Sequence, residues 1–346
     1  MRFSAARVAR LLAGALAAVL AGLTLAAPPT AVGQMRKEVV VVVKIAGIPW
    51  FNRMAVGVER AGKQLGIKAS LVGPSKADAA SQVSMVEDLL NKGVPAIAVV
   101  PTDAKSLTPV FEKARARHIA IVTHENPFET GAVDYDIETI DNVAYGKLAV
   151  DQIVANVKKM GVQCTPASPC GYVQLVGGLT VPLHNFWADT ATAYIKEKFP
   201  MLKELTTRLP TAESADDSRK AVLDLITTYG DKLRAVIGWG SLGPIGAAAA
   251  VREKGLQARL IAGGSAIPST AVPYLRDGSL KWLQLWDPAD AGVGMVYVAK
   301  QMLDGKKLAP GMNIPGLGPI AIRGKDVTVN KAVFATTAAE AAKFGF

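Results

Sequence analysis

The feature that most constrains the fold is a repeating order of buried strand, loop, amphipathic helix and glycine. The first unit begins with the near-continuous apolar run Glu38–Lys44, which is typical of a parallel strand buried on both faces. Apolar residues at helical spacing follow from Met54 to Leu65, and Gly66 closes the stripe. Strands that alternate with such helices predict right-handed βαβ units and a parallel sheet.

The same order continues along the chain, with further helical stripes at 107–114, 222–229 and 295–302. Strand candidates begin near residues 38, 69, 96, 119, 171, 204, 234, 258 and 281. A chain of 346 residues suits two domains of ordinary size. We therefore expect two parallel sheets with a boundary near 124–126, and one large sheet is the alternative.

The first 33 residues have the organisation of a secretory signal peptide. Three arginines precede the Ala- and Leu-rich run Leu11–Ala27, and no acidic residue occurs before Glu38. The apolar run is only about 17 residues long, which favours cleavage, best at Ala31–Gly33, over a retained anchor. No cysteine lies near that point, so the sequence excludes a lipoprotein anchor and predicts an exported protein.

Several functional classes are disfavoured by composition. The net charge is +10, but the lysines and arginines are interspersed with acids, unlike a nucleic-acid-binding stripe. The segment Gly238–Gly243 has neither a dinucleotide fingerprint nor a P-loop lysine. The sequence has only three histidines, which supply few ligands for a zinc site. We expect no cofactor, no metal and no nucleic-acid partner; an enzyme using His124, Glu125 and His184 as acid and base is the alternative.

The two cysteines, Cys164 and Cys170, flank a proline-rich loop. In an exported protein this spacing predicts a local disulfide, and two free thiols are the alternative.

Chemistry-bearing residues gather directly after the predicted strands. The carboxyl ends of parallel strands meet at one edge, where open α/β sheets place their ligands. Carboxylates and amides can bond sugar hydroxyls, while aromatic rings can cover apolar sugar faces. The residues at these strand ends are Trp50, Phe51, Asn52, Asp103, His124, Glu125, Asn126, Trp239, Ser241, Ser265 and Asp287.

Some of these residues also have purely structural interpretations. Asp103 and Asp287 could cap the helices that follow them. Trp50 and Phe51 could be wedges between a loop and a helix.

Other residues are equally open to two interpretations. Lys44 could be a surface charge, although its apolar strand favours an inward position. His184 and Asn185 could line the rim of the second domain. Trp187 is interpreted as core because it lies inside a predicted helix.

Four regions of the sequence carry a family resemblance. They are Lys44–Phe51 with Gly62–Ile67, Ser81–Val83 with Leu90–Ile97, Leu285–Asp287 and Asn313–Gly316. Together they resemble the type I periplasmic sugar-binding proteins of ABC importers, and most closely the branch of autoinducer-2 and rhamnose receptors. The resemblance spans about residues 38–346.

The resemblance implies two Rossmann-like lobes with parallel sheets, joined by a three-segment hinge that crosses near Glu125, Gly264 and Pro288. The implied domains are a signal peptide at 1–33, an N-terminal lobe at 34–124 plus about 265–287, and a C-terminal lobe at 125–264 plus about 288–346. The implied function is capture of a small sugar or polyol by lobe closure, without catalysis. A monomer would deliver the ligand to an ABC permease in the inner membrane.

The autoinducer-2 branch also implies particular ligand-binding residues. Lys44 matches the lysine of that site, and Glu125 replaces an aspartate. The other side-chain and backbone positions fall on Leu183, His184, Trp239 and Ser241. Because leucine cannot accept a hydrogen bond from a hydroxyl, these departures argue against autoinducer-2 as the ligand.

Glu125 and Asp287 would neutralise Lys44, which favours a neutral sugar or polyol as the ligand. A receptor for autoinducer-2 or another signal, feeding uptake or chemotaxis, is the first alternative. An exported sugar-modifying enzyme is the second.

Overall fold

The computed structural model describes residues 37–126, 131–331 and 333–346. The predicted signal peptide and its cleavage site lie outside these residues. Within them, no helix is long and apolar enough to cross a membrane.

The first sheet has the strand order β13-β14-β5-β4-β3-β1-β2. Its strands are β1 (Glu38–Val42), β2 (Lys68–Val72), β3 (Ala96–Val99), β4 (Ala120–Thr123), β5 (Tyr135–Glu138), β13 (Ala321–Arg323) and β14 (Asp326–Thr328). The apolar run pairs in parallel with β2 and β3, and its alternate valines enter two different cores. Burial on both faces is therefore confirmed.

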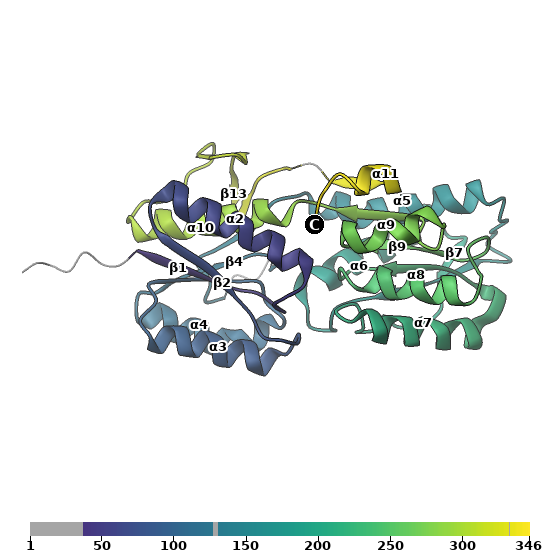
Figure 1. Cartoon of the computed structure of the whole chain (residues 1–346), viewed down its shortest axis with the longest axis horizontal. Helices are drawn as coiled ribbons and strands as arrows, with labels where there is room; N and C mark the ends of the chain where they lie inside the picture. Colours follow the sequence, from purple (N-terminus) through teal and green to yellow (C-terminus); the bar gives the residue numbers. More distant parts are fainter. Residues whose placement is uncertain (1–36, 127–130, 332) are drawn as a thin grey trace, which may run out of the picture. The chain divides into compact units, whose positions relative to one another are not determined.

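Helices cover both faces of this sheet (Figure 1). Helices α2 (Pro49–Leu65) and α10 (Pro288–Leu303) pack together on one face. Helices α3 (Ala79–Asn91) and α4 (Ala104–Ala116) lie on the other.

The second sheet has the order β15-β10-β9-β8-β6-β7. Its strands are β6 (Cys170–Leu175), β7 (Leu202–Glu204), β8 (Leu233–Gly238), β9 (Ile261–Ser265), β10 (Trp282–Leu285) and the antiparallel β15 (Phe334–Thr336). Its helices are α5 (Asn142–Lys159), α6 (Pro182–Lys198), α7 (Ala215–Tyr229), α8 (Gly243–Glu253) and α9 (Pro268–Arg276). Two mainly parallel sheets, each with one antiparallel edge strand (β13 and β15) and flanking helices, confirm the expected fold class.

Smaller elements complete the described chain. They are a 3₁₀ turn at Gly230–Lys232, the hairpin β11 (Asn313–Ile314) and β12 (Gly318–Pro319), and the short helix α11 (Ala338–Ala341).

The chain passes between the sheets three times, but not where the sequence predicted. It crosses between β5 and α5, between β10 and α10, and between β14 and β15. The crossing predicted near Pro288 falls next to the second of these. The crossings predicted near Glu125 and Gly264 are wrong.

The lobe boundaries change accordingly. Residues 125–126 and 131–138 belong with the first sheet because β5 pairs with β4, and 288–328 belong there because α10 packs on α2 and β14 pairs with β5. Residues 265–287 belong with the second sheet, where β10 pairs with β9. The predicted assignments of residues 125–126, 131–138 and 288–328 to the C-terminal lobe, and of residues 265–287 to the N-terminal lobe, are therefore wrong.

Two local features explain these errors. β5 carries Asp136 and Glu138 among its buried residues, so it resembles a polar loop in the sequence. Gly264 resembles a break but has a φ of 134° and lies against the backbone of Gly238, where a side chain would not fit. The glycine continues the strand instead of ending it.

The nine predicted strands each correspond to an observed strand, and the four helical stripes lie in α2, α4, α7 and α10. Gly66 ends α2 with a φ of 63°, as the left-handed C-terminal position requires. The structure joins Cys164 and Cys170 in a disulfide in the loop before and at the start of β6, with their Cα atoms 5.3 Å apart.

The close contact of α2 and α10 generates a prediction. Gly57 faces the backbone of Ala289 with no room for a Cβ atom. We expect Gly57→Ala to separate the two helices and to lower the free energy of unfolding by about 1–3 kcal/mol. Urea denaturation measures this change. Val56→Ala, at an exposed position of the same helix, is the control and should change stability by less than about 0.5 kcal/mol. Equal stability of the Gly57→Ala and Val56→Ala variants would contradict the close packing.

Candidate functional site

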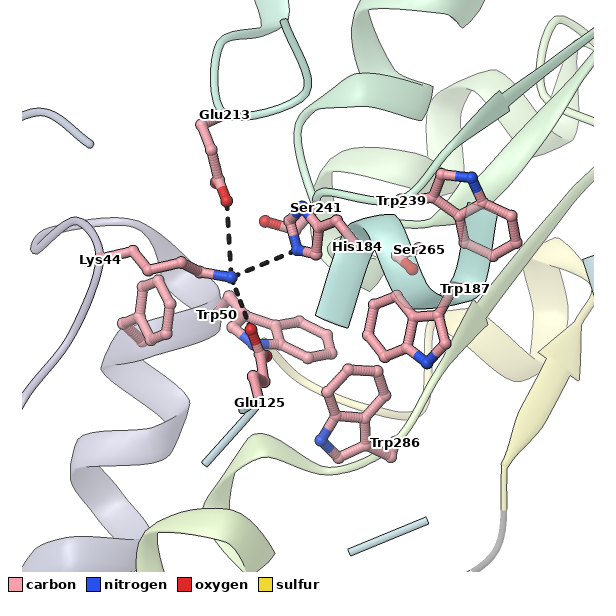
Figure 2. Close-up of a pocket in the computed structure, with 11 residues that line it drawn as sticks. Lys44, Trp50, Glu125, His184, Trp187, Glu213, Trp239, Ser241, Ser265 and Trp286 are labelled. Carbon is pink, nitrogen blue, oxygen red and sulfur yellow. Dashed lines mark hydrogen bonds and ion pairs between the residues drawn. The ribbon is translucent and has the colours of Figure 1, made fainter. Parts of the chain in front are cut away.

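The carboxyl ends of the strands in both sheets supply the walls of one pocket (Figure 2). The pocket is small in this structure, with a cavity volume of about 20 Å³ open to the centre of a water-sized sphere. Eight residues singled out in the sequence line it: Lys44, Trp50, Phe51, Glu125, His184, Trp239, Ser241 and Ser265. Three further lining residues were not predicted as site residues: Trp187, Glu213 and Trp286.

The first sheet positions four of these side chains. Lys44 follows β1, and Glu125 follows β4. Trp50 and Phe51 lie in the first turn of α2, which Pro49 begins. The apolar strand thus ends by placing a cation and two aromatic rings at the pocket.

The second sheet supplies the remainder. Trp239 follows β8, Ser265 ends β9 and Trp286 follows β10. His184 and Trp187 are three residues apart on α6, so both side chains point from one helix face.

A buried cluster of charged groups forms one end of the pocket. The Lys44 ammonium donates a hydrogen bond to Glu125 Oε2 at 2.5 Å and lies 3.6 Å from Glu213 Oε1. Burial opposes the charge of Lys44, but the two carboxylates outweigh that effect and raise its pKa. Asp287 had been expected as the second carboxylate; Glu213 occupies that position instead.

His184 completes this end of the pocket as a neutral ring. Burial and the nearby Lys44 charge hold its pKa well below the ordinary value. Each ring nitrogen faces a donor: the Gly177 backbone N–H lies 3.0 Å from Nδ1, and the Lys44 ammonium lies 3.2 Å from Nε2. A neutral imidazole has one lone pair, so the ring accepts one of these two hydrogen bonds at a time.

Three indole rings, the tryptophan wall (Trp187, Trp239 and Trp286), form the other end. Trp187 and Trp286 have centroids 5.5 Å apart and planes inclined by 68°. Trp187 and Trp239 are 6.2 Å apart and inclined by 39°. Trp50 meets Trp286 edge to face at 4.9 Å. The rings therefore surround a space, and do not form one flat face.

Five predicted site residues do not line this pocket, and two of them cap helices. Asp103 accepts the Ser106 N–H at the start of α4. Asp287 accepts the Ala289 N–H at the start of α10 and pairs with Arg53 through two hydrogen bonds of 2.8 and 2.6 Å. The capping interpretation describes both contacts.

The other three are held elsewhere. Asn52 is exposed on α2. Asn185 donates to the carbonyl oxygens of Gly178 and Val181. Asn126 is buried, and its backbone N–H hydrogen-bonds to Asp136.

The three unpredicted lining residues differ in whether a signal in the sequence could have identified them. Trp286 directly follows β10, which ends at Leu285, whereas the sequence predicted a strand that included it; with the observed strand end, the rule that selected Trp239 would also have selected it. Trp187 lies one turn beyond His184 on the same helix. Glu213 follows no predicted strand and reaches the pocket because the preceding chain pairs with β6 through the isolated bridge of Leu175 and Leu209.

His124 is not placed for the acid–base role of the enzyme alternative. Its Nδ1–H donates to the Ile137 carbonyl oxygen at 2.7 Å, and burial lowers its pKa. Among the residues that the structure describes, no group of three or more His, Cys, Asp or Glu side chains could hold a metal ion.

The charged cluster generates a prediction about stability. We expect Lys44→Met to lower the free energy of unfolding by about 3–5 kcal/mol, because it leaves Glu125 and Glu213 buried without a cation. Chemical denaturation measures this loss. Lys44→Met combined with Glu125→Gln should regain part of it, since the second change removes one uncompensated charge. A single variant as stable as the parent protein would show that the cluster contributes nothing.

A second buried acidic pair lies on β5, next to the first crossing. Burial, and the negative charge of Asp136, raise the pKa of Glu138 well above its ordinary value; burial likewise raises the pKa of Asp136 to about 6. Thr123 donates to Asp136 at 2.6 Å and Asn142 donates to Glu138 at 3.0 Å. Asp326 and Glu125 add negative charge nearby, so the pair favours a bound proton.

This pair predicts a pH dependence. Because the folded-state pKa values lie above those of the unfolded chain, stability should fall as pH rises from about 4 through 6 and beyond. Glu138→Gln resembles the protonated acid, so we expect it to flatten this decline and to raise stability at about pH 8 by about 1–3 kcal/mol. Denaturation at several pH values tests this, with the exposed Glu112→Gln as control. An unchanged pH profile in Glu138→Gln would contradict the assignment.

Comparison with known proteins identifies the family. A family model described as the periplasmic binding protein domain matches residues 39–307. The ribose import binding protein of Bacillus subtilis is 24% identical over 270 residues, which cover 77% of this chain and 82% of that protein. The D-allose-binding periplasmic protein of Escherichia coli is 26% identical over 281 residues, which cover 78% and 85%.

Solved structures agree in fold. LsrB from Clostridium saccharobutylicum, in complex with AI-2, matches with a TM-score of 0.83 at 21% identity, covering 89% of this chain and 100% of that one. A carbohydrate transporter solute binding protein from Agrobacterium radiobacter, in complex with D-arabinose, matches with a TM-score of 0.76 at 21% identity, covering 90% and 98%. Since the family model spans well over half of the sequence, the chain belongs to the periplasmic binding protein family.

Proposed function

We propose that this protein is the solute receptor of an ABC import system and binds a small neutral sugar or polyol. The observation that carries the proposal is the buried pocket, in which strand ends of both sheets combine hydrogen-bonding groups with aromatic rings. Small-ligand sites are concave, largely apolar and equipped with a few converging polar groups. The names of the relatives support this reading, because they are binding proteins for ribose and allose and not enzymes.

The charged cluster favours a neutral ligand. Lys44 is the cation of the pocket, and Glu125 and Glu213 both lie within 4 Å of its ammonium. The cluster therefore offers no excess positive charge for a carboxylate or phosphate. The carboxylate oxygens of Glu125 and Glu213 can instead accept hydrogen bonds from hydroxyl groups, and the Lys44 ammonium can donate to them.

The mechanism follows from where the groups originate. Lys44 and Glu125 belong to the first sheet, whereas His184 and Glu213 belong to the second. A ligand that contacts both sets is bound best when the two lobes meet, so it shifts the population from an open to a closed state. A membrane permease would then recognise the closed form.

We also propose where the protein acts and in which assembly. The basic and apolar first 33 residues would export the chain to the periplasm and be removed there. The mature protein would act as a monomer that docks on an inner-membrane ABC permease.

A signal receptor for autoinducer-2, feeding uptake or chemotaxis, is the second candidate. It is favoured by the structural match to LsrB in complex with AI-2 and by the presence of Lys44 in the pocket. Leu183 is fully buried and does not line the pocket, so the position that the resemblance aligns with an aspartate of that branch supplies no carboxylate; Glu213 is the second carboxylate of the pocket.

Thermal unfolding of purified residues 34–346 tests the proposal. A ligand that binds only the folded state stabilises it by about 2.7 kcal/mol at a hundredfold excess over Kd. We expect a clear rise in melting temperature with one class among pentoses, hexoses, deoxysugars, polyols, sugar acids and autoinducer-2. Response to sugar acids alone would contradict a neutral ligand, and response to none would contradict the receptor function.

The variant Trp239→Ala extends this test to the pocket itself. Loss of the indole should weaken binding of the responding ligand by about 1–3 kcal/mol, because an aromatic contact surface is removed. Isothermal titration calorimetry measures the affinity. Unchanged affinity would remove Trp239 from the binding site.

A further inference from the structure

The segment that follows α11 leads from the second lobe back to the first. Strand β15 and helix α11 belong with the second sheet, because β15 pairs with β10 and α11 packs on α9. Beyond α11, the carbonyl oxygen of Phe346 accepts a hydrogen bond of 2.8 Å from the Ser269 backbone N–H of α9. The backbone of Phe346 is therefore attached to the second lobe, and Figure 1 shows this end of the chain (C) near the start of α2.

The side chain of Phe346 contacts the first lobe instead. Its ring centroid lies 6.3 Å from that of Trp50, with the two planes inclined by 64°. The Arg53 guanidinium lies 5.5 Å from the centroid of the same ring. Trp50 and Arg53 are three residues apart on α2, so they share one face of that helix. One phenylalanine ring thus makes an aromatic contact and a cation–π contact with the first lobe.

Both contact residues on α2 also touch the second lobe or the hinge. Trp50 lines the pocket and meets Trp286, which follows β10, edge to face at 4.9 Å. Arg53 donates two hydrogen bonds, of 2.8 and 2.6 Å, to Asp287. Asp287 lies in the second crossing and caps α10. Phe346 therefore rests on the two side chains of α2 that join this lobe to its surroundings at the hinge.

The contacts of Phe346 depend on how the two lobes are placed. Helix α9 holds its backbone and helix α2 holds its ring. Rotation of one lobe against the other changes the separation of α9 and α2, so the ring contacts are lost when the lobes part. The three crossings are covalent in every state, and they give no comparable preference for the closed one.

We propose that Phe346 is a strap that ties the two lobes together beside the hinge and holds Trp50 against Trp286. It is a positioning residue, because it does not line the pocket and acts on it through Trp50 and through the ease of lobe opening. This inference goes beyond the proposed function, since opening is a property of the protein without a ligand.

Single-molecule fluorescence energy transfer between dyes on the two lobes measures the open and closed populations of the ligand-free protein. Suitable positions are Lys105 and Leu179, which are exposed, belong to different lobes and line one surface groove. The dyes would be attached after Lys105→Cys and Leu179→Cys, because the disulfide of Cys164 and Cys170 does not react with them.

We expect Phe346→Ala to raise the ratio of open to closed molecules by about fivefold to tenfold, since it removes one aromatic and one cation–π contact. Phe346→Tyr keeps the ring and should give the ratio of the parent protein. Phe346→Leu fills most of the same space without a ring, so it should raise the ratio by about twofold to threefold. The leucine variant keeps the test available if Phe346→Ala does not fold.

Phe199→Ala is the matched control. Phe199 is also a partly buried phenylalanine of the second lobe, but its ring contacts Tyr194 of the same lobe, at 5.4 Å. Its loss should leave the ratio unchanged even where it lowers stability. The strap is overturned by a parent protein that is open throughout, by Phe346 variants with the parent ratio, or by an equal shift in Phe199→Ala.

The sugar panel separates this inference from the proposed function. A receptor that must close to bind loses affinity as its closed population falls, so Phe346→Ala should weaken binding of the sugar that raises the melting temperature by up to the same factor. A shifted population without a response to any sugar would support the strap and overturn the receptor. An unchanged population with normal sugar binding would overturn the strap and leave the receptor.

Discussion

The pairing of the buried Lys44 ammonium with Glu125 and Glu213 is the interaction on which the functional site depends. A charge removed from water must be paired, and an unpaired one would lose its proton or destabilise the fold. Glu125 provides the close partner from the same sheet, while Glu213 and His184 approach from the other. The electrostatic requirement of one lysine therefore brings the strand ends of two separate sheets to a single pocket.

The lysine cluster also determines what the rest of the pocket can do. Because both carboxylates lie against Lys44, the charged groups of the pocket are concentrated at that end, and the opposite end is lined mainly by indole rings. The indole nitrogens of Trp187 and Trp239 are bonded to Asn142 and Gln174 behind them. These hydrogen bonds fix the orientation of the rings, so that their carbon surfaces face the ligand space.

Some of the site could be predicted from residues because parallel strands place their carboxyl ends together. That rule found Glu125, Trp239 and Ser265, and it missed Trp286 only because the predicted strand ran one residue too far. It also selected Asp103 and Asp287, since an N-cap aspartate occupies the same place in the chain as a ligand-binding one. Only the direction of the side chain separates the two roles, and the sequence does not contain that direction.

The sequence by itself determined the strand–helix alternation, because apolar periodicity and helix-ending glycines are local properties of the chain. It also determined which strand ends carry polar and aromatic groups. The tertiary structure decided which strands share a sheet, where the three crossings lie and that Glu213, and not Asp287, pairs with Lys44. Those outcomes depend on contacts between residues far apart in the chain, such as the pairing of β14 with β5, whose energies no local pattern records.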